Sequence, residues 1–196
     1  MGELKINSEY SAQPSIQKPN PFLRESIDYI LENKIINNTV SKIKVGDYGC
    51  GKLRHLLILE EYFKNIVLID TKQQLERKQK LFEINNTTAK EYIKKYHNNS
   101  TNISVFDTEK ISAQKIKFDI IFNICVFDVV LKATRFEIIE NVRKLLKMNG
   151  IFVLIIPRND FSIIKRCCPE NRYQDGYILN EIKLLRFIEI SNTLMI

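Results

Sequence analysis

The feature that most constrains this chain is the alternation of short β-branched runs with stretches of helical periodicity. A strand buried on both faces reads as a short continuous apolar run, whereas the apolar residues of a helix recur every three to four positions. Alternation of the two patterns is typical of a parallel sheet covered by helices. The sequence therefore predicts a three-layer α/β fold with a mainly parallel sheet and helices on both faces. The five predicted strands are Ile43 to Asp47, Ile66 to Asp70, Ile103 to Phe106, Phe118 to Asn123 and Ile151 to Ile156.

Helical patterns precede and separate these strands. Apolar spacing predicts a first helix from Phe22 to Leu31. Thr71 and Thr134 each stand three residues before a Gln or Glu, which is the spacing of a helix start. Gly150 is placed to end the helix that begins at Thr134. A further short helix is expected after Thr87.

The two ends of the chain are less regular than its middle. The length of 196 residues is ordinary for one domain, so we expect residues 22–196 to form a single domain behind an arm or lid at residues 1–21. The C-terminal strands are expected to be short or truncated. The elements expected there are a helix near 161–167, a turn at 169–176, a helix over 180–188 and a final strand over 189–196.

Composition limits the function classes. The chain is 44% hydrophobic and 27% charged, as in ordinary globular proteins, and no apolar run approaches the roughly 20 residues of a membrane-spanning helix. With no signal-peptide pattern, a cytoplasmic protein with no membrane segment is expected. The excess of 30 Lys+Arg over 23 Asp+Glu favours an anionic partner, although the basic residues are dispersed. The cysteines, Cys50, Cys125, Cys167 and Cys168, have no metal-binding spacing, so reduced thiols and no metal site are expected.

The most informative segment is the glycine turn after the first predicted strand. Asp47 is followed by Gly49 and Gly51 at the start of a helix, and ligands of open α/β sheets bind at such strand ends. The third glycine of the dinucleotide fingerprint is replaced by Arg54. A carboxylate at Asp47 would also repel a pyrophosphate on the helix N-terminus. These residues favour S-adenosylmethionine, which has an ammonium and a sulfonium but no phosphate, over NAD.

Two further acids end predicted strands. Asp70 lies 21 residues after Gly49, the spacing of an acid that accepts hydrogen bonds from ribose hydroxyls, although it could instead be the N-cap of the next helix. Asp107 follows the third strand. Because parallel strands end at the same edge, Asp47, Asp70 and Asp107 are expected to lie together. Such a constellation is hard to explain by capping alone.

These residues resemble a class I S-adenosylmethionine-dependent methyltransferase. The resemblance covers about Phe22 to Pro157 and rests on Asp47 to Gly51, Ile69-Asp70, Asp107 and Phe118 to Asn123. It implies a Rossmann-like fold and transfer of a methyl group from S-adenosylmethionine. The implied cofactor-binding residues are Asp47, Gly49, Cys50 and Gly51 at the methionine part, Asp70 with Thr71 at the ribose, Asp107 and Thr108 at the adenine, and Asn123 and Ile124 at the methionine moiety and the methyl group.

The acceptor is less defined than the cofactor. The aromatic Pro-Pro motif of base amino methylation and the Pro-Cys nucleophile of cytosine methylation are absent, so a small molecule and a nucleic acid both stay open as acceptors. Arg158 is a candidate anchor for an anionic substrate, and Asp128 or Asp160 a candidate base. The alternative function is a noncatalytic S-adenosylmethionine-binding partner subunit with an incomplete substrate site. Homo-oligomers are also possible.

Overall fold

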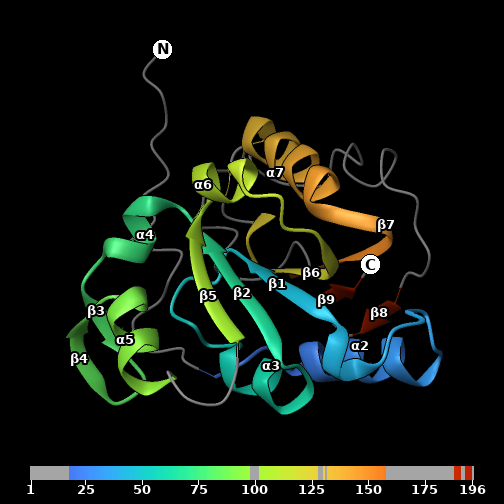
Figure 1. The fold of residues 1–196 in the computed structure, drawn as a ribbon, viewed down its shortest axis with the longest axis horizontal. Coiled ribbons are helices and arrows are strands. Elements are labelled where there is room, and N and C mark those ends of the chain that lie inside the picture. Colours follow the sequence, from blue (N-terminus) through green and yellow to red (C-terminus); the bar gives the residue numbers. More distant parts are fainter. Residues whose placement is uncertain are drawn as a thin grey trace.

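A mainly parallel sheet forms the centre of the molecule (Figure 1). The computed structural model describes residues 18–97, 102–127, 130, 132–157, 188–190 and 193–195. Within these residues the sheet has seven strands in the order β5-β2-β1-β6-β7-β9-β8. The strands are β1 (Lys44–Tyr48), β2 (Asn65–Asp70), β5 (Asn102–Asp107), β6 (Phe118–Ile124), β7 (Leu146–Pro157), β8 (Ile188–Ile190) and β9 (Thr193–Met195).

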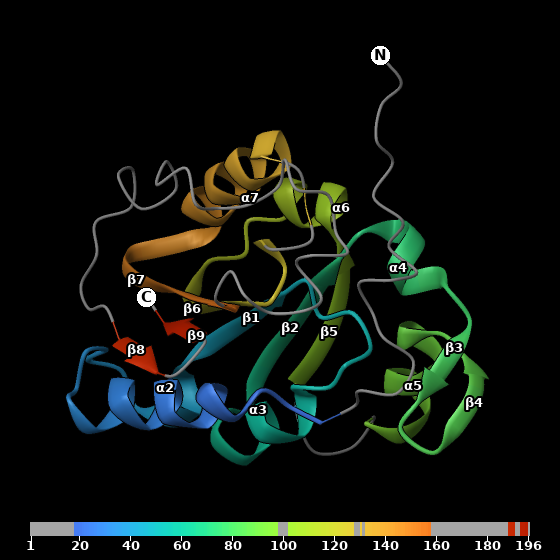
Figure 2. The same ribbon diagram turned by 180° about the vertical axis from the view of Figure 1, so that it is seen from behind.

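Helices cover both faces of the sheet, as Figures 1 and 2 show from opposite sides. One apolar core joins the sheet to α2 (Pro21–Glu32), α3 (Leu56–Tyr62), α4 (Lys72–Glu76) and α5 (Ala89–Tyr96). A second core joins the other face to α6 (Thr108–Ala113) and α7 (Lys132–Leu145). The predicted three-layer α/β fold is therefore confirmed. Its five predicted strands correspond to β1, β2, β5, β6 and β7.

A small hairpin beside the edge of the sheet was not predicted. It consists of β3 (Gln79–Leu81) and β4 (Ile84–Thr87), and Figure 1 places it next to α5. Its strands are too short and too polar for an alternating apolar pattern. Phe82 turns the chain with a φ of 52°, so the glycine or asparagine that usually marks such a turn is missing.

The expected end of the helix before β7 is wrong, and so is its expected start. The helix α7 begins at Lys132, which places Thr134 inside its first turn, and it ends at Leu145, five residues before Gly150. Gly150 lies within β7, where the register with β6 shifts. A Cβ on Gly150 would lie 2.9 Å from the carbonyl oxygen of Phe118, so close packing of the two strands accounts for this glycine.

The chain terminus also differs from expectation. Two strands, β8 and β9, replace the single strand expected over 189–196, and residue 188 belongs to β8 and not to a helix. β9 runs antiparallel between β7 and β8. The helices expected near 161–167 and over 180–187 and the turn at 169–176 lie outside the described residues.

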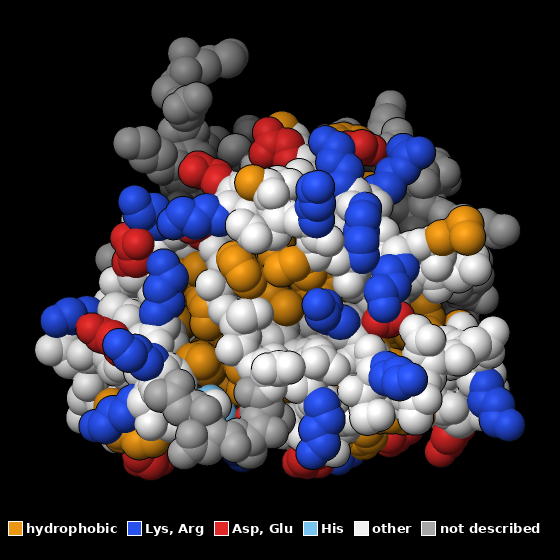
Figure 3. All heavy atoms as spheres, viewed as in Figure 1, with side chains coloured by type: hydrophobic (Ala, Val, Ile, Leu, Met, Phe, Trp, Pro, Cys, Tyr) orange, Lys and Arg blue, Asp and Glu red, His pale blue; other side chains and the backbone are white. Residues whose placement is uncertain are grey.

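In the described part of the chain, no helix combines the length and the apolar content needed to cross a lipid bilayer. Charged side chains are spread over the face drawn in Figure 3, in keeping with the net charge of +7.

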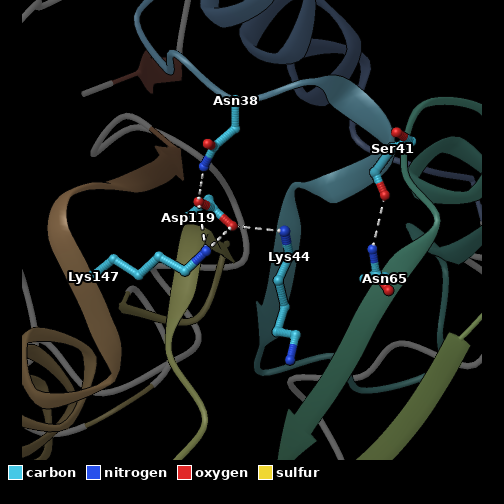
Figure 4. Close-up of polar contacts among 6 residues, drawn as sticks. All are labelled: Asn38, Ser41, Lys44, Asn65, Asp119 and Lys147. Atoms are coloured by element: carbon cyan, nitrogen blue, oxygen red, sulfur yellow. Dashed lines mark hydrogen bonds and ion pairs between the residues drawn. The ribbon is translucent and has the colours of Figure 1, made fainter.

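The buried carboxylate of Asp119 connects the first residues of three strands. It lies at the edge of the sheet opposite the glycine turn. Asp119, 3% exposed, accepts hydrogen bonds from Asn38 Nδ2 at 2.6 Å, the Lys44 backbone N at 2.8 Å and Lys147 Nζ at 2.8 Å (Figure 4). Burial raises the pKa of Asp119, but the bonds from Lys147, the Lys44 backbone N and Asn38 together hold it below its ordinary value. Asp119 therefore joins β1, β6 and β7 through one ionised group.

We expect Asp119→Ala to lower the free energy of unfolding by about 2–4 kcal/mol at pH 7, because three donors lose a charged acceptor. The lowered pKa means that this stabilisation is present above the unfolded-state pKa of about 3.9 and is lost as the pH falls through the folded-state pKa. Urea unfolding at pH 7 and pH 3 measures both effects. The control is Glu109→Ala at an exposed site. An Asp119→Ala loss no larger than that of the control would contradict this role.

Candidate functional site

Three carboxylates lie at the edge of the sheet where the parallel strands end. In the strand register Asp47 of β1 is opposite Leu68 of β2, and Asp70 of β2 is opposite Asp107 of β5. Because β5, β2 and β1 are neighbours in that order, Asp107, Asp70 and Asp47 follow one another along this edge. The predicted juxtaposition of the three acids is thus present in the fold.

The glycine turn is held against the end of β2 by backbone hydrogen bonds. The amides of Gly49 and Cys50 both donate to the Ile69 carbonyl oxygen, at 2.7 and 3.2 Å. Gly49 has a φ of +90°, and a Cβ there would lie 2.3 Å from Cγ2 of Val126 in the loop after β6. Gly51 has a φ of +50°, but the nearest atom to a Cβ there is 3.9 Å away. Gly49 therefore permits a close approach of two loops, whereas a Cβ on Gly51 would make only an ordinary van der Waals contact.

Asp70 joins the end of β2 to the glycine turn. Its Oδ2 accepts from the Gly51 backbone N at 2.8 Å, and its Oδ1 accepts from the Thr71 backbone N at 2.7 Å. Burial raises the pKa of Asp70 to about 6, although the two backbone bonds act in the opposite direction. Thr71, and not Asp70, caps α4 by accepting from the Gln74 backbone N at 3.3 Å. The carboxylate of Asp70 is thus not used as a cap, and each oxygen can accept a further hydrogen bond.

Asp47 is a buried carboxylate without a hydrogen-bond donor among the described residues. It is 1% exposed, and neither of its oxygens has a partner. The nearest basic group is the ring of His55 at the start of α3, with Nδ1 3.8 Å from Asp47 Oδ2. Burial lowers the pKa of His55, while Asp47 acts to raise it. An anionic Asp47 would therefore face a largely neutral ring at pH 7, which is unfavourable unless a cation comes close.

Cys50 and Asp107 have structural roles in the fold. The Cys50 side chain is 2% exposed within the apolar core, and burial raises the pKa of its thiol well above the ordinary value. Asp107 caps α6 by accepting from the Lys110 backbone N at 2.8 Å, a bond that lowers its pKa, and Lys110 Nζ lies 3.1 Å away. Thr108 is the first residue of α6. At these positions the backbone is more available to a ligand than the side chains are.

Asn123 and Ile124 end β6 beneath the same edge. Asn123 is fully buried and donates from Nδ2 to the Tyr48 carbonyl oxygen at 2.9 Å, while its Oδ1 has no partner among the described residues. Ile124 is 3% exposed within the core. Asn123 thereby fixes the end of β1 where the glycine turn begins. The candidate catalytic residues Asp128, Arg158 and Asp160 lie outside the described residues.

Three neighbours of the site were not singled out from the sequence. Val126 packs on Gly49, His55 lies beside Asp47, and Asn20 Nδ2 is 3.6 Å from Sγ of Cys125 after β6. Asn20 also caps α2, since its side chain accepts from the Phe22 backbone N. The Asn20-Pro21 pair is a helix-start signal that could have located Asn20. No sequence pattern marks Val126 or His55.

The residues that are present fit a cationic nucleoside ligand without phosphate. Asp47 has unpartnered oxygens for a cation, Asp70 has spare acceptor capacity for hydroxyl donors, and Gly51 is not closely packed. Clusters of three or more His, Cys, Asp or Glu suited to a metal ion are absent from the described ranges.

The comparisons with known proteins agree with this geometry. Residues 46–154, more than half of the chain, match the family model described as a methyltransferase domain. The protein YmfD of Escherichia coli (strain K12) is 28% identical over 197 residues, which cover all of this chain and 82% of that protein. Among solved structures, the N-methyltransferase NodS from Bradyrhizobium japonicum WM9, in complex with S-adenosyl-L-homocysteine, has a TM-score of 0.60 at 17% identity and covers 96% of this chain and 93% of NodS.

Two further structures extend the comparison. A type 11 methyltransferase from Sulfolobus solfataricus, described as putative, has a TM-score of 0.55 at 16% identity, with 88% of each chain covered. The chain spans only 26% of the length of PKMT2 from Rickettsia typhi, which covers 74% of this chain at 23% identity with a TM-score of 0.49. With the matched family model spanning the glycine turn and the ends of β2, β5 and β6, the chain belongs to the class I S-adenosylmethionine-dependent methyltransferases.

Proposed function

We propose that this chain binds S-adenosylmethionine at the carboxyl edge of its sheet and transfers the methyl group to an acceptor. The observation that carries this proposal is the Asp70 carboxylate. It is fixed by the backbone of Gly51 and Thr71 at the point where the glycine turn meets the end of β2. A fixed carboxylate beside a glycine turn suits a ribose that offers two hydroxyl donors.

The charge of this edge supports a ligand of this kind. Asp47 and Asp70 disfavour a pyrophosphate, and Asp47 lacks a cation within the described residues. The ammonium of S-adenosylmethionine would supply that cation, since Asp47 lies two residues before Gly49. Asp107 and Thr108, next along the edge, would border the adenine through their backbone.

Bound S-adenosylmethionine supplies an electrophilic methyl group on its sulfonium, so no covalent intermediate with the protein is required. The chain's own contribution is to bind and align, which provides much of the rate of a bimolecular transfer. The backbone of Gly49, Cys50 and Gly51 would contact the methionine part of the ligand. Asn123 and Ile124, at the end of β6, would lie on the other side of that part. Arg158 as an anchor for an anionic acceptor and Asp128 or Asp160 as a base remain predictions from the sequence.

The acceptor is proposed to be a small molecule or a nucleic acid, and the cytoplasm is proposed as the location. The buried Cys50 side chain is a thiol outside any disulfide, which agrees with a reducing compartment. The arm at residues 1–21 stays a predicted lid, and self-association stays possible. A noncatalytic partner subunit is the alternative function. It would bind S-adenosylmethionine without transferring a methyl group to RNA or metabolite fractions of a cell extract.

Calorimetric titration with S-adenosylhomocysteine tests the ribose contact directly. We expect saturable binding by the natural chain, no competition by NAD, and at least about tenfold weaker binding by Asp70→Asn, which loses a charged acceptor. Glu76→Gln on the neighbouring α4 is the control and should bind normally. Unchanged affinity in a folded Asp70→Asn variant would place the ribose elsewhere.

The raised pKa of Asp70 predicts how this affinity depends on pH. The ionised carboxylate is the acceptor for the ribose hydroxyls, so affinity should be constant well above pH 6 and fall as the pH drops through about 6, the pKa of Asp70. The fall is limited to about tenfold per pH unit for one proton. Titrations between pH 8 and pH 5 should show it for the natural chain. A fall of the same size in Asp70→Asn would assign it to another group.

The two glycines of the turn should respond differently to alanine. Gly49→Ala adds a Cβ 2.3 Å from Val126 at a positive φ, so we expect a large loss of stability and of S-adenosylhomocysteine binding. Gly51→Ala meets no close atom, and we expect a loss of only about 1–2 kcal/mol from its left-handed backbone. Thermal unfolding of both variants measures the difference. Equal losses would contradict the packing of Val126 on Gly49.

A further inference from the structure

The edge of the sheet where the parallel strands begin is lined with lysines. Each of four neighbouring strands, β2, β1, β6 and β7, has a lysine within two residues of its first residue. With neighbouring strands about 4.8 Å apart, the row extends over about 15 Å. We call it the basic edge and define it as Lys42, Lys44, Lys64, Lys115, Lys117 and Lys144.

No described carboxylate pairs with a lysine of the basic edge. Five of its lysines are exposed and Lys44 is partly exposed, and within the part of the chain that the structure describes none of the six forms an ion pair. Acids close in sequence to these lysines have other partners. Asp119 is buried against Lys147, and Glu140 pairs with Arg143. Before Lys64, Glu61 pairs with Arg24 and Glu60 with His97. In Figure 4 the Lys44 side chain extends away from Asp119.

The surface view agrees with this distribution. In Figure 3, Lys and Arg side chains are spread over this face, and those on its right have few acidic side chains among them. The opposite edge has Asp47, Asp70 and Asp107. The sheet is therefore electrostatically polar, with carboxylates where its parallel strands end and lysines where they begin.

We propose that the basic edge docks the phosphodiester backbone of a nucleic-acid duplex. A row of lysines binds successive phosphates and releases counterions, which requires no base contacts. Among the described residues, the large apolar side chains exposed near the strand starts are Val40, before β1, and Met148 of β7, whereas a membrane surface would be met by a broad apolar face. A duplex therefore fits this edge better than a lipid surface does.

The position of the basic edge separates docking from methyl transfer. The five residues of β1 extend over about 16 Å between the two edges. A duplex on the lysines would consequently leave the glycine turn free, and the edge would act as an anchor and not as the acceptor site. This inference does not depend on the proposed methyl transfer.

Fluorescence anisotropy with labelled 20-base-pair RNA and DNA duplexes tests the proposal. We expect binding of the natural chain that weakens steeply with salt. The triple variant Lys64→Glu, Lys117→Glu, Lys144→Glu should bind at least about 30-fold more weakly in 100 mM salt, with a log–log salt slope shallower by about 2 to 3. The matched control is Lys78→Glu, Lys94→Glu, Lys95→Glu, which alters exposed lysines near the β3–β4 hairpin and α5 by the same charge and should bind within threefold of the natural chain.

The other outcomes overturn the proposal. An equal loss in both triple variants would assign binding to net charge and not to this edge. Binding to phosphatidylserine vesicles without binding to either duplex would assign the edge to a membrane surface. Comparison of the RNA and DNA duplexes shows which nucleic acid the chain binds more tightly. Normal S-adenosylhomocysteine binding by both triple variants shows that they are folded. If the natural chain does not bind S-adenosylhomocysteine, the proposed cofactor site is wrong, but the result with the duplexes is unaffected.

Discussion

The hydrogen bond from the Gly51 backbone N to the Asp70 carboxylate is the contact on which the site depends. It joins residues that are 19 positions apart in the sequence and lie on neighbouring strand ends. The parallel register brings β1 and β2 to the same edge, and Gly49 then turns the chain tightly enough for the amide to reach Asp70. The same carboxylate receives the Thr71 amide, so one side chain orients both segments.

The two edges of the sheet have opposite electrostatic roles. Where the strands end, carboxylates are held by backbone amides and helix starts, and Asp47 lacks a cation among the described residues. Where they begin, the buried Asp119 binds Lys147 and the Lys44 backbone N, and the lysines of the basic edge have no ion pair within the described ranges. A cationic nucleoside ligand suits the first edge, and a polyanion suits the second.

Much of the fold follows from local sequence patterns. Five strands, the first helix and the order of acids at the strand ends were predicted because buried parallel strands and amphipathic helices have distinct periodicities. The β3–β4 hairpin was missed because Phe82 turns the chain without a glycine. Gly150 was misread as a helix stop because its true constraint is contact with Phe118 across the sheet, which local sequence does not encode.

The sequence predicted at which edge of the sheet the candidate site lies, but not the side-chain contacts within it. The glycine turn and Asp70 have a defined spacing, so the edge proposed for the cofactor could be predicted from the sequence. The capping of α6 by Asp107 and the bond from Asn123 to the Tyr48 carbonyl depend on side-chain geometry. The burial of Asp47 beside His55 depends on the packing of α3 against β1, which no spacing rule specifies.

A crystal structure of the chain with S-adenosylhomocysteine would show whether the carboxyl edge of the sheet binds the cofactor. If the carboxyl edge is the cofactor site, both ribose hydroxyls will lie within hydrogen-bond distance of the Asp70 carboxylate while Gly51 keeps its own bond to it, and the ligand's ammonium will lie on the Asp47 side of the glycine turn. A ligand bound at another edge, or one whose ribose makes no contact with Asp70, would contradict the account.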